Sequence, residues 1–535
     1  MIGKLETPQV AVTSKKLVVR TGQSADSRTI RSDEIDNQVM TPEHQRSSDI
    51  QDDMAIPCGS SVQQSAEPDL PPSGSNLFSV ESNPTSSRVR EYKGFGSFMS
   101  DNVEDLVRVP TTDYKAPDQP AHVILHVQSS TRKLGPLKDM PFGRQSRKLF
   151  MLDFERWTFI NHGAFGSPLK IAFKAAQKWR EHCERQPLRF IDRELFPQTV
   201  HVLRKLSALI KCSPTDLVFV QNATQGLNAV INSVHLEPED AVFMLSVGYG
   251  SVKKILKAAC DQSGASLVTA DVQFPLIDGH SSILDLVADS LPARAKLAVF
   301  DAVTSNTAVV LPIQHLVRLC HSRGVPVLID GAHALGSMPI DLTALGADFF
   351  VGNCHKWFCN PKGCGFLWAN PMYFAQYGGA VKPLVISHGS GSGFLSDFIW
   401  DGCRDYSAIL ALEVTMNMWL QVGVKRVDKY IKTTLAAACE LLTAQWKTST
   451  LVPLSMCANM ALVEVPKMPW LHISSATSDS ACTLQNMLYE RRIECPVKCI
   501  DGTLYVRISV HIYNDLDDYK VLGDAIMDLK FHNLE

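Results

Sequence analysis

The chain has 535 residues, of which 45% are hydrophobic and 20% charged, and its formal net charge is −3. This composition is typical of a globular protein with a core larger than one ordinary domain. The small net charge offers no bulk attraction to nucleic acid or to an anionic membrane, and no apolar run approaches 18 residues. We therefore expect no nucleic-acid partner and no membrane span. Fourteen cysteines without a disulfide framework fit a reducing compartment, which predicts a cytoplasmic protein.

The first quarter of the chain contains little that would form a core. Thr21–Arg90 is rich in Ser, Gln, Asp and Pro, and Phe78 is its only aromatic residue. So little apolar surface cannot offset the conformational entropy that folding removes. We predict a mostly disordered extension over residues 1–135, in which His122–Val127 is the one candidate strand.

Ordered structure is expected from about residue 136. Thr158–Pro168 reads TFINHGAFGSP, in which the glycines allow close backbone approach and the polar pair Asn161 and His162 is placed to reach a ligand. Taken alone, the motif is equally well explained as a glycine turn before a helix. An amphipathic helix is predicted over Lys170–Glu184.

Between residues 201 and 423, short buried strands alternate with helices, a pattern that favours a parallel α/β sheet. A helix over Thr199–Ile210 leads into this region, and a helix over Ala408–Leu420 leaves it and stops at Gly423. The predicted strands are Leu217–Val220, Ala241–Val247, Leu297–Phe300, Val325–Ile329 and Asp348–Val351.

Two residues at the ends of neighbouring strands suggest a cofactor. Asp330 ends one strand and Lys356 lies just past the next, so both are expected at the carboxyl edge of the sheet, where open α/β sheets bind ligands. The pairing suits pyridoxal phosphate, because a lysine amine forms a Schiff base with it and a carboxylate keeps its pyridinium nitrogen protonated. For these two residues alone, a strand-end aspartate and a surface lysine remain the alternative.

Further motifs follow in order around this pair. They are Asp330-Gly-Ala-His333, Leu345-Gly-Ala-Asp348, His355-Lys356-Trp357 and Pro361-Lys-Gly363-Cys-Gly365. Together they resemble the class V aminotransferase family of fold-type I pyridoxal-phosphate enzymes, which includes cysteine desulfurases and isopenicillin-N-epimerase-like proteins.

The resemblance covers residues 142–530 and implies an α/β fold. A segment over 136–200 would contribute to the active site, and a large domain over 201–423 would hold pyridoxal phosphate on a mostly parallel sheet. A smaller α+β domain would follow over 424–535. The resemblance also implies a homodimer with active sites at the interface.

Several cofactor contacts are implied by the resemblance. Ala223 and Thr224, at the start of a helix, would bind the phosphate, and Asn353 would add a second contact there. For that turn alone an ordinary helix N-cap is the alternative. Tyr249 fits the position of the aromatic residue that stacks on the ring, and Ser305 aligns with a polar group near the phenolic oxygen.

Catalytic roles are implied in the same way. Lys356 would carry the cofactor and act as general base at Cα, with Asp330 on the ring nitrogen and His333 beside the phenolic oxygen. His355 directly precedes the lysine, where packing is an equally good explanation for a lone histidine.

Substrate contacts are expected from two separate parts of the chain. Arg507, in the predicted strand Leu504–Val510, would hold an amino-acid carboxylate in a bidentate fork. Asn161 and His162 would lie at the mouth of the site. In the segment Phe398–Asp405, Cys403 stands where the family has threonine, so the hydroxyl contact to the partner subunit's phosphate is lost.

The motifs favour a lyase, of the C–S type, or an epimerase acting at the α-carbon of a small amino-acid substrate. An aminotransferase is an alternative. A cysteine desulfurase is disfavoured, because Cys495 and Cys499 precede Arg507 without the family's R-S-G-x-x-C motif. A non-catalytic scaffold is disfavoured, because the lysine and the aspartate are both present. No metal site is predicted, since Cys354, Cys359 and Cys364 lack an ordinary zinc spacing.

Overall fold

The computed structural model describes residues 102–535, apart from residues 277, 374–379, 470–474 and 532–535. The part of the expected extension up to residue 101 therefore lies outside the described residues.

Residues 102–135 contain two helices, which differs from the expectation of a mostly disordered segment. They form α1 (Val103–Arg108) and α2 (Ala121–Leu134). Val103 and Val107 of α1 are buried in the main core. The predicted strand at His122–Val127 is wrong, because these residues lie within α2, which packs along α4 (Lys170–Arg185).

The centre of the fold is a seven-stranded sheet whose order is β2-β8-β7-β6-β5-β3-β4. Only β8 runs antiparallel to its neighbours, which confirms the expected α/β class with a mostly parallel sheet. The strands are β2 (Leu217–Val220), β3 (Ala241–Leu245), β4 (Ser266–Ala270), β5 (Ala295–Asp301), β6 (Val327–Gly331), β7 (Phe349–Asn353) and β8 (Gly365–Ala369). β6, β7 and β8 are buried throughout, as expected for strands covered on both faces.

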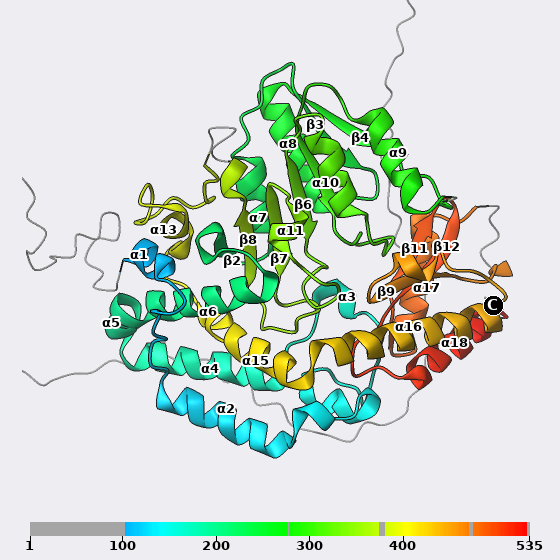
Figure 1. Cartoon of the computed structure of the whole chain (residues 1–535). Coiled ribbons are helices and arrows are strands. Elements are labelled where there is room, and N and C mark those ends of the chain that lie inside the picture. Colours follow the sequence, from blue (N-terminus) through cyan, green and yellow to red (C-terminus); the bar gives the residue numbers. More distant parts are fainter. Residues whose placement is uncertain (1–101, 277, 374–379, 470–474, 532–535) are drawn as a thin grey trace, which may run out of the picture. The chain divides into compact units, whose positions relative to one another are not determined.

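Helices connect and cover these strands (Figure 1). α7 packs on β6, β7 and β8, whereas α10 packs on β5 and β6. The helices of this region are α6 (Leu195–Ile210), α7 (Ala223–Ile231), α8 (Gly250–Ser263), α9 (His280–Ser290), α10 (Ile313–His321) and α11 (Leu342–Leu345).

A bent pair of helices leaves the sheet region. After α13 (Phe394–Ile399), the short α14 (Ser407–Leu410) and α15 (Leu412–Val422) are followed by α16 (Val424–Trp446), and the chain bends by 75° at the break. Gly423 stands at this break with φ of 93°, a conformation that favours glycine. Within the described residues no single helix could cross a membrane, and only this bent pair reaches the required length and apolar composition.

The C-terminal part is built on a three-stranded antiparallel sheet of order β11-β12-β9. Its strands are β9 (Met460–Glu464), β11 (Val497–Ile500) and β12 (Thr503–Ser509), and they pack with α16, α17 (Ser478–Glu490) and α18 (Leu516–Lys530).

The N-terminal segment is joined to this C-terminal part. β1 (Thr158–Phe159) pairs in parallel with β10 (Ile493–Glu494) and leads directly into the short helix α3 (His162–Phe165). The N-H-G motif at the start of α3 is thereby brought beside β12 and the residues that follow β7.

Candidate active site

Two carboxyl groups meet at the carboxyl edge of the large sheet. Asp330 in β6 pairs in register with Asp301 at the end of β5, and both side chains are buried. The Asp330 carboxylate accepts the backbone N–H of Ala332 at 2.9 Å. Burial raises the pKa of both carboxyl groups, and the neighbouring Asp330 pushes the pKa of Asp301 further, well above its usual range. The surroundings therefore favour the neutral form of Asp301.

The lysine after β7 faces a histidine whose tautomer can be deduced. The indole Nε1 of Trp357 donates to His333 Nδ1 at 3.1 Å, so the neutral imidazole carries its proton on Nε2. That nitrogen lies 3.1 Å from Lys356 Nζ. An N–H group facing an amine requires the amine to be neutral. Burial shifts the lysine toward that form by lowering the pKa of Lys356 to about 8, so the amine is mostly neutral above about pH 8, and burial also lowers the pKa of His333.

An aromatic ring stands over the lysine. Tyr249 is the N-cap residue of α8, and its ring centroid lies 6.0 Å from Lys356 Nζ. The residue is 41% exposed, although it lies beside buried groups. It is therefore placed where a flat ring bound to Lys356 would meet an aromatic face.

The start of α7 lies next to Asn353. The backbone N–H of Ala223 donates to Asn353 Oδ1 at 2.9 Å, so these two expected phosphate ligands contact each other. In this arrangement the N–H of Ala223 is already used, whereas Thr224 in the same first turn is exposed. His355 lies between Cys354 and Lys356, and its Nδ1 is buried without a hydrogen-bond partner. Burial lowers the pKa of His355 to about 4.

Arg507 is a buried cation without an acidic partner in the described part of the chain. It is 4% exposed on β12. Its guanidinium donates to the backbone carbonyl of Ser305 and, at 3.2 Å, to Asn161 Oδ1, while Nε is buried with no partner. Burial lowers the pKa of Arg507 to about 10. A buried charge of this kind is costly unless an anion neutralises it.

The structure differs from the sequence expectation at His162. This side chain is fully buried, with Nδ1 2.8 Å from the Tyr513 hydroxyl and Nε2 3.1 Å from the Lys356 carbonyl oxygen. Both ring nitrogens are therefore used inside the protein. His162 supports the backbone that carries the lysine, whereas Asn161 accepts a hydrogen bond from Arg507.

Comparisons with known proteins place this site in a family. Residues 198–522 match the sequence profile of the family described as aminotransferase class-V. The chain belongs to the aminotransferase class-V family. It is accordingly a pyridoxal-phosphate enzyme, and the expectations for family, fold class and cofactor are confirmed.

Relatives within the aminotransferase class-V family have names that refer to sulfur chemistry and to epimerisation. A probable chloroplastic L-cysteine desulfhydrase of Arabidopsis thaliana is 32% identical over 403 residues, covering 70% of this chain and 83% of that protein. The isopenicillin N epimerase of Amycolatopsis lactamdurans is 26% identical, covering 64% and 88%. Among solved structures, the cystine C–S lyase C-DES in complex with cysteine persulfide has a TM-score of 0.61 at 18% identity, covering 70% and 98%.

The residues at the sheet edge fit the cofactor of the class V family. They supply a neutral lysine amine, a carboxylate, an aromatic face and an unpartnered imidazole nitrogen, all in a site lined by buried groups. Pyridoxal phosphate supplies an electron sink for carbanions at Cα when it is bound. Lys356 would hold it covalently, Asp330 and His333 would contact its ring, and Thr224 would contact its phosphate.

Sequence reasoning missed two residues of this site. Asp301 received no role, although it ends a strand beside the strand of Asp330, and this register was the available signal. Trp357 was read only as part of a motif, and no sequence pattern indicates that its indole orients His333.

The three cysteines near the lysine are free thiols. Cys354, Cys359 and Cys364 are free and buried, whereas Cys403 is exposed.

Proposed function

We propose that this protein is a C–S lyase that releases sulfide from L-cysteine or a related sulfur-containing amino acid. The observation that carries the proposal is the buried Arg507, which lacks an acidic partner among the described residues and lies close enough to lower the pKa of Lys356. An amino acid would bring its carboxylate to this cation and its α-carbon to the amine. The names of the relatives support sulfide elimination as the reaction.

The proposed mechanism assigns a task to each residue. The guanidinium of Arg507 fixes the carboxylate through parallel hydrogen bonds, which sets the direction of the Cα–H bond. As a neutral amine, Lys356 would act as the base that removes the Cα proton. Asp330 would hold its negative charge toward the ring nitrogen of the bound cofactor. His333, held by Trp357, keeps its Nε2 proton directed at the lysine nitrogen.

The atoms balance without an external oxidant. Cysteine loses its Cα proton to Lys356, and the Cβ–S bond breaks with its electron pair leaving on sulfur. The sulfide takes up a proton, and the remaining aminoacrylate is hydrolysed. Cysteine and water therefore give pyruvate, ammonia and hydrogen sulfide.

The geometry of the two cysteines before Arg507 weighs against a desulfurase. Cys495 is buried, its Sγ lies near the backbone carbonyl of Arg507, and burial raises the pKa of its thiol. Cys499 is half-buried in β11, and its thiol contacts the carbonyl of Ala476 at 3.2 Å. A persulfide carrier needs a reactive thiolate on an accessible loop, and neither residue meets that requirement.

The proposal is tested by product analysis on the purified holoenzyme. L-Cysteine should yield sulfide, pyruvate and ammonia in equal amounts, and Lys356→Ala should abolish all three. Formation of alanine in place of pyruvate would show a desulfurase. Loss of optical activity without sulfide would show an epimerase, and either result would overturn the lyase assignment.

We further propose a homodimer, two domains joined at the bend near Gly423, and a cytoplasmic location. Exposed apolar side chains such as Phe165 (73%), directly after the N-H-G motif, support association at this face. Light scattering during size-exclusion chromatography measures the mass of the particle, which tests the homodimer.

Imaging of a tagged full-length chain tests the cytoplasmic location. One relative is named chloroplastic, so an organellar signal is the competing outcome.

A further inference from the structure

The side-chain amide of Asn161 connects two side chains of opposite charge. Its Oδ1 accepts a hydrogen bond from the Arg507 guanidinium at 3.2 Å, and its Nδ2 donates to Glu494 Oε1 at 3.0 Å. An arginine can only donate and a carboxylate can only accept, so both neighbours require the same orientation of the amide. The three side chains therefore form one chain of hydrogen bonds that ends at the proposed carboxylate-binding group.

The backbone just before Asn161 is fixed by strand pairing. The N–H of Ile160 donates to the carbonyl of Glu494 at 3.0 Å, and the carbonyl of Ile160 accepts the N–H of Ser509 at 3.0 Å. Ile160 is thereby held between β10 and β12. Glu494 contacts this segment twice, through its main chain and through its side chain, and only the second contact depends on its residue type.

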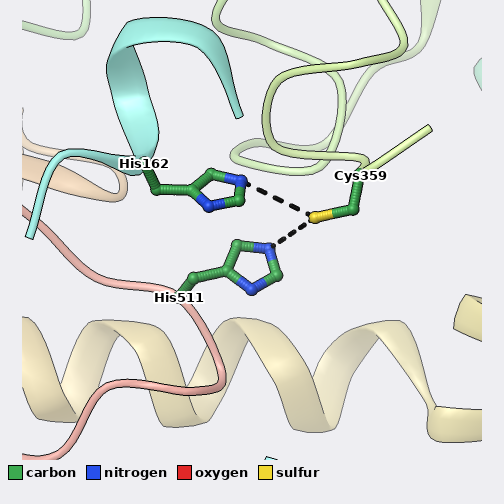
Figure 2. Close-up of side chains that lie close together, drawn as sticks. All are labelled: His162, Cys359 and His511. Carbon is green, nitrogen blue, oxygen red and sulfur yellow. Dashed lines mark hydrogen bonds between the residues drawn. The ribbon is translucent and has the colours of Figure 1, made fainter. Parts of the chain in front are cut away.

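The residue just after Asn161 is anchored in a buried cluster (Figure 2). His162 lies with Cys359 and His511, whose side chains are, like its own, at most 1% exposed. The two imidazole rings stack with centroids 4.3 Å apart, and both contact the thiol of Cys359. Because the backbone is held on both sides of Asn161, the position of its amide depends on the contacts of that side chain.

The guanidinium of Arg507 has two acceptors in the described part of the chain, and both are neutral. The carbonyl oxygen of Ser305 accepts from Nη1, and Oδ1 of Asn161 accepts from Nη2. Two contacts define the plane of the guanidinium, whereas one would leave it free to turn. A neutral acceptor orients the group without cancelling its charge. The amide thus transmits the position of Glu494 to Arg507 without an ion pair that would compete with a ligand's carboxylate.

We propose that Glu494 is a positioning residue for the carboxylate-binding Arg507 and that it acts through Asn161. The inference rests on the proposed function, because it takes Arg507 to bind the carboxylate of an amino acid. Without an acceptor at position 494, Nδ2 of Asn161 loses its partner in a half-buried place, and the amide can turn toward another one. The guanidinium then keeps only its contact with Ser305.

The experiment measures how holoenzyme variants bind two amines that cannot undergo elimination. L-Alanine has the α-carboxylate, and ethylamine is the same molecule without it. The absorbance of the bound cofactor reports the binding of each. Glu494→Ala should weaken binding of L-alanine about fivefold, the size of one hydrogen bond, and leave ethylamine within about twofold. Glu494→Gln, whose amide oxygen can still accept from Asn161, should bind L-alanine within about twofold of the parent.

A double-mutant cycle separates this role from a general effect on the fold. Asn161→Ala should weaken L-alanine at least about fivefold, and adding Glu494→Ala should cause no further loss, because Glu494 acts through the amide. Glu490→Ala is the matched control, since it removes an exposed acid at the end of α17. This variant should bind both amines within about twofold of the parent.

Three outcomes would overturn the inference. They are unchanged affinity of Glu494→Ala for L-alanine, equal losses for the two amines, and additive losses in the double variant. Glu494→Asp keeps the test decisive if Glu494→Ala fails to fold. Its shorter side chain withdraws the carboxylate from Asn161, so it should weaken L-alanine about threefold, and unchanged affinity would again overturn the role of Glu494.

Arg507→Lys, measured in parallel, separates a failure of this inference from a failure of the proposed function. If Arg507→Lys loses affinity for L-alanine and Glu494→Ala does not, Arg507 binds the carboxylate and only the role of Glu494 is wrong. If Arg507→Lys binds L-alanine as the parent does, the carboxylate is bound elsewhere, and the proposed function loses the observation that carries it.

Discussion

Asp301 and Asp330 are neighbours in register at the ends of two parallel strands, and both are buried. Two carboxyl groups in such surroundings do not both ionise readily, because each charge raises the other's pKa. We expect the proton on Asp301, because burial and the neighbouring Asp330 raise its pKa well above the usual range. We expect Asp330, whose carboxylate accepts the N–H of Ala332, to be the charged member.

This assignment predicts that the same substitution lowers activity far less at one position than at the other. Asp301→Asn mimics a protonated carboxyl group and should retain activity within about tenfold. Asp330→Asn removes the charge beside the ring nitrogen and should lower kcat by about a thousandfold or more. Steady-state kinetics with L-cysteine measure both. Similar losses in the two variants would show that the proton is not held by Asp301.

The lowered pKa of Lys356 predicts how the apoenzyme takes up its cofactor. Only the neutral amine attacks the aldehyde of pyridoxal phosphate, and burial brings the pKa of this amine to about 8 from its usual value of 10.5. The rate of cofactor capture, followed by absorbance, should therefore rise with pH and level off above about pH 8. A rate that still climbs tenfold per pH unit at pH 9.5 would contradict the shift.

The buried guanidinium of Arg507 predicts a carboxylate-specific defect. Arg507→Lys replaces a fork with a point charge, so KM for amino acids should rise at least tenfold while cofactor binding persists. Cysteamine, which lacks the carboxylate, serves as the control ligand and should bind equally to both proteins. If the variant loses affinity for both ligands to the same degree, Arg507 supports the fold and does not bind the carboxylate.

The close packing of Gly166 against the backbone of His355 and Lys356 predicts that only glycine is tolerated at this position. A Cβ here would lie 2.1 Å from the carbonyl oxygen of His355 and 2.7 Å from Cα of Lys356. Gly166→Ala should therefore displace this backbone and lose most of the bound cofactor. Gly346→Ala is the control for a positive φ alone, since Gly346 has φ of 70° and ψ of 16° with no atom within 4 Å of an added Cβ, whereas Gly166 has ψ of 176°. Absorbance of bound cofactor measures the loss in each variant.

The two helices within residues 102–135 predict that this segment, expected from sequence to be mostly disordered, contributes to the stability of the fold. Val107→Ala empties a buried position in α1 and should lower the free energy of unfolding by about 2 kcal/mol. Leu125→Ala in α2 changes an exposed side chain and should alter it by about 0.5 kcal/mol or less. Urea denaturation measures both. A neutral Val107→Ala would mean that α1 contributes little to the fold.

The elements best predicted from sequence were the central strands, because buried parallel strands are continuous apolar runs. β2 was predicted with its observed bounds, and the strands around Asp330 and Lys356 were placed within two residues. Residues 102–135 were missed because α1 buries only a few apolar side chains, each against distant segments. His162 was misread for a related reason, since its partners Tyr513 and Lys356 are far away in sequence.

The pairing of β1 with β10 has a consequence for synthesis of the chain. Thr158 and Ile493 pair across more than 300 residues, and Asn161 meets Arg507 only through that closure. At a translation rate of about 5 to 20 residues per second, the residues that pair with the N-H-G segment are synthesised on the order of tens of seconds after it. A chain whose synthesis stops before β12 contains Lys356, Asp330 and Tyr249, but it lacks Arg507, the proposed carboxylate-binding residue. Completion of the catalytic centre is therefore one of the last events of biosynthesis.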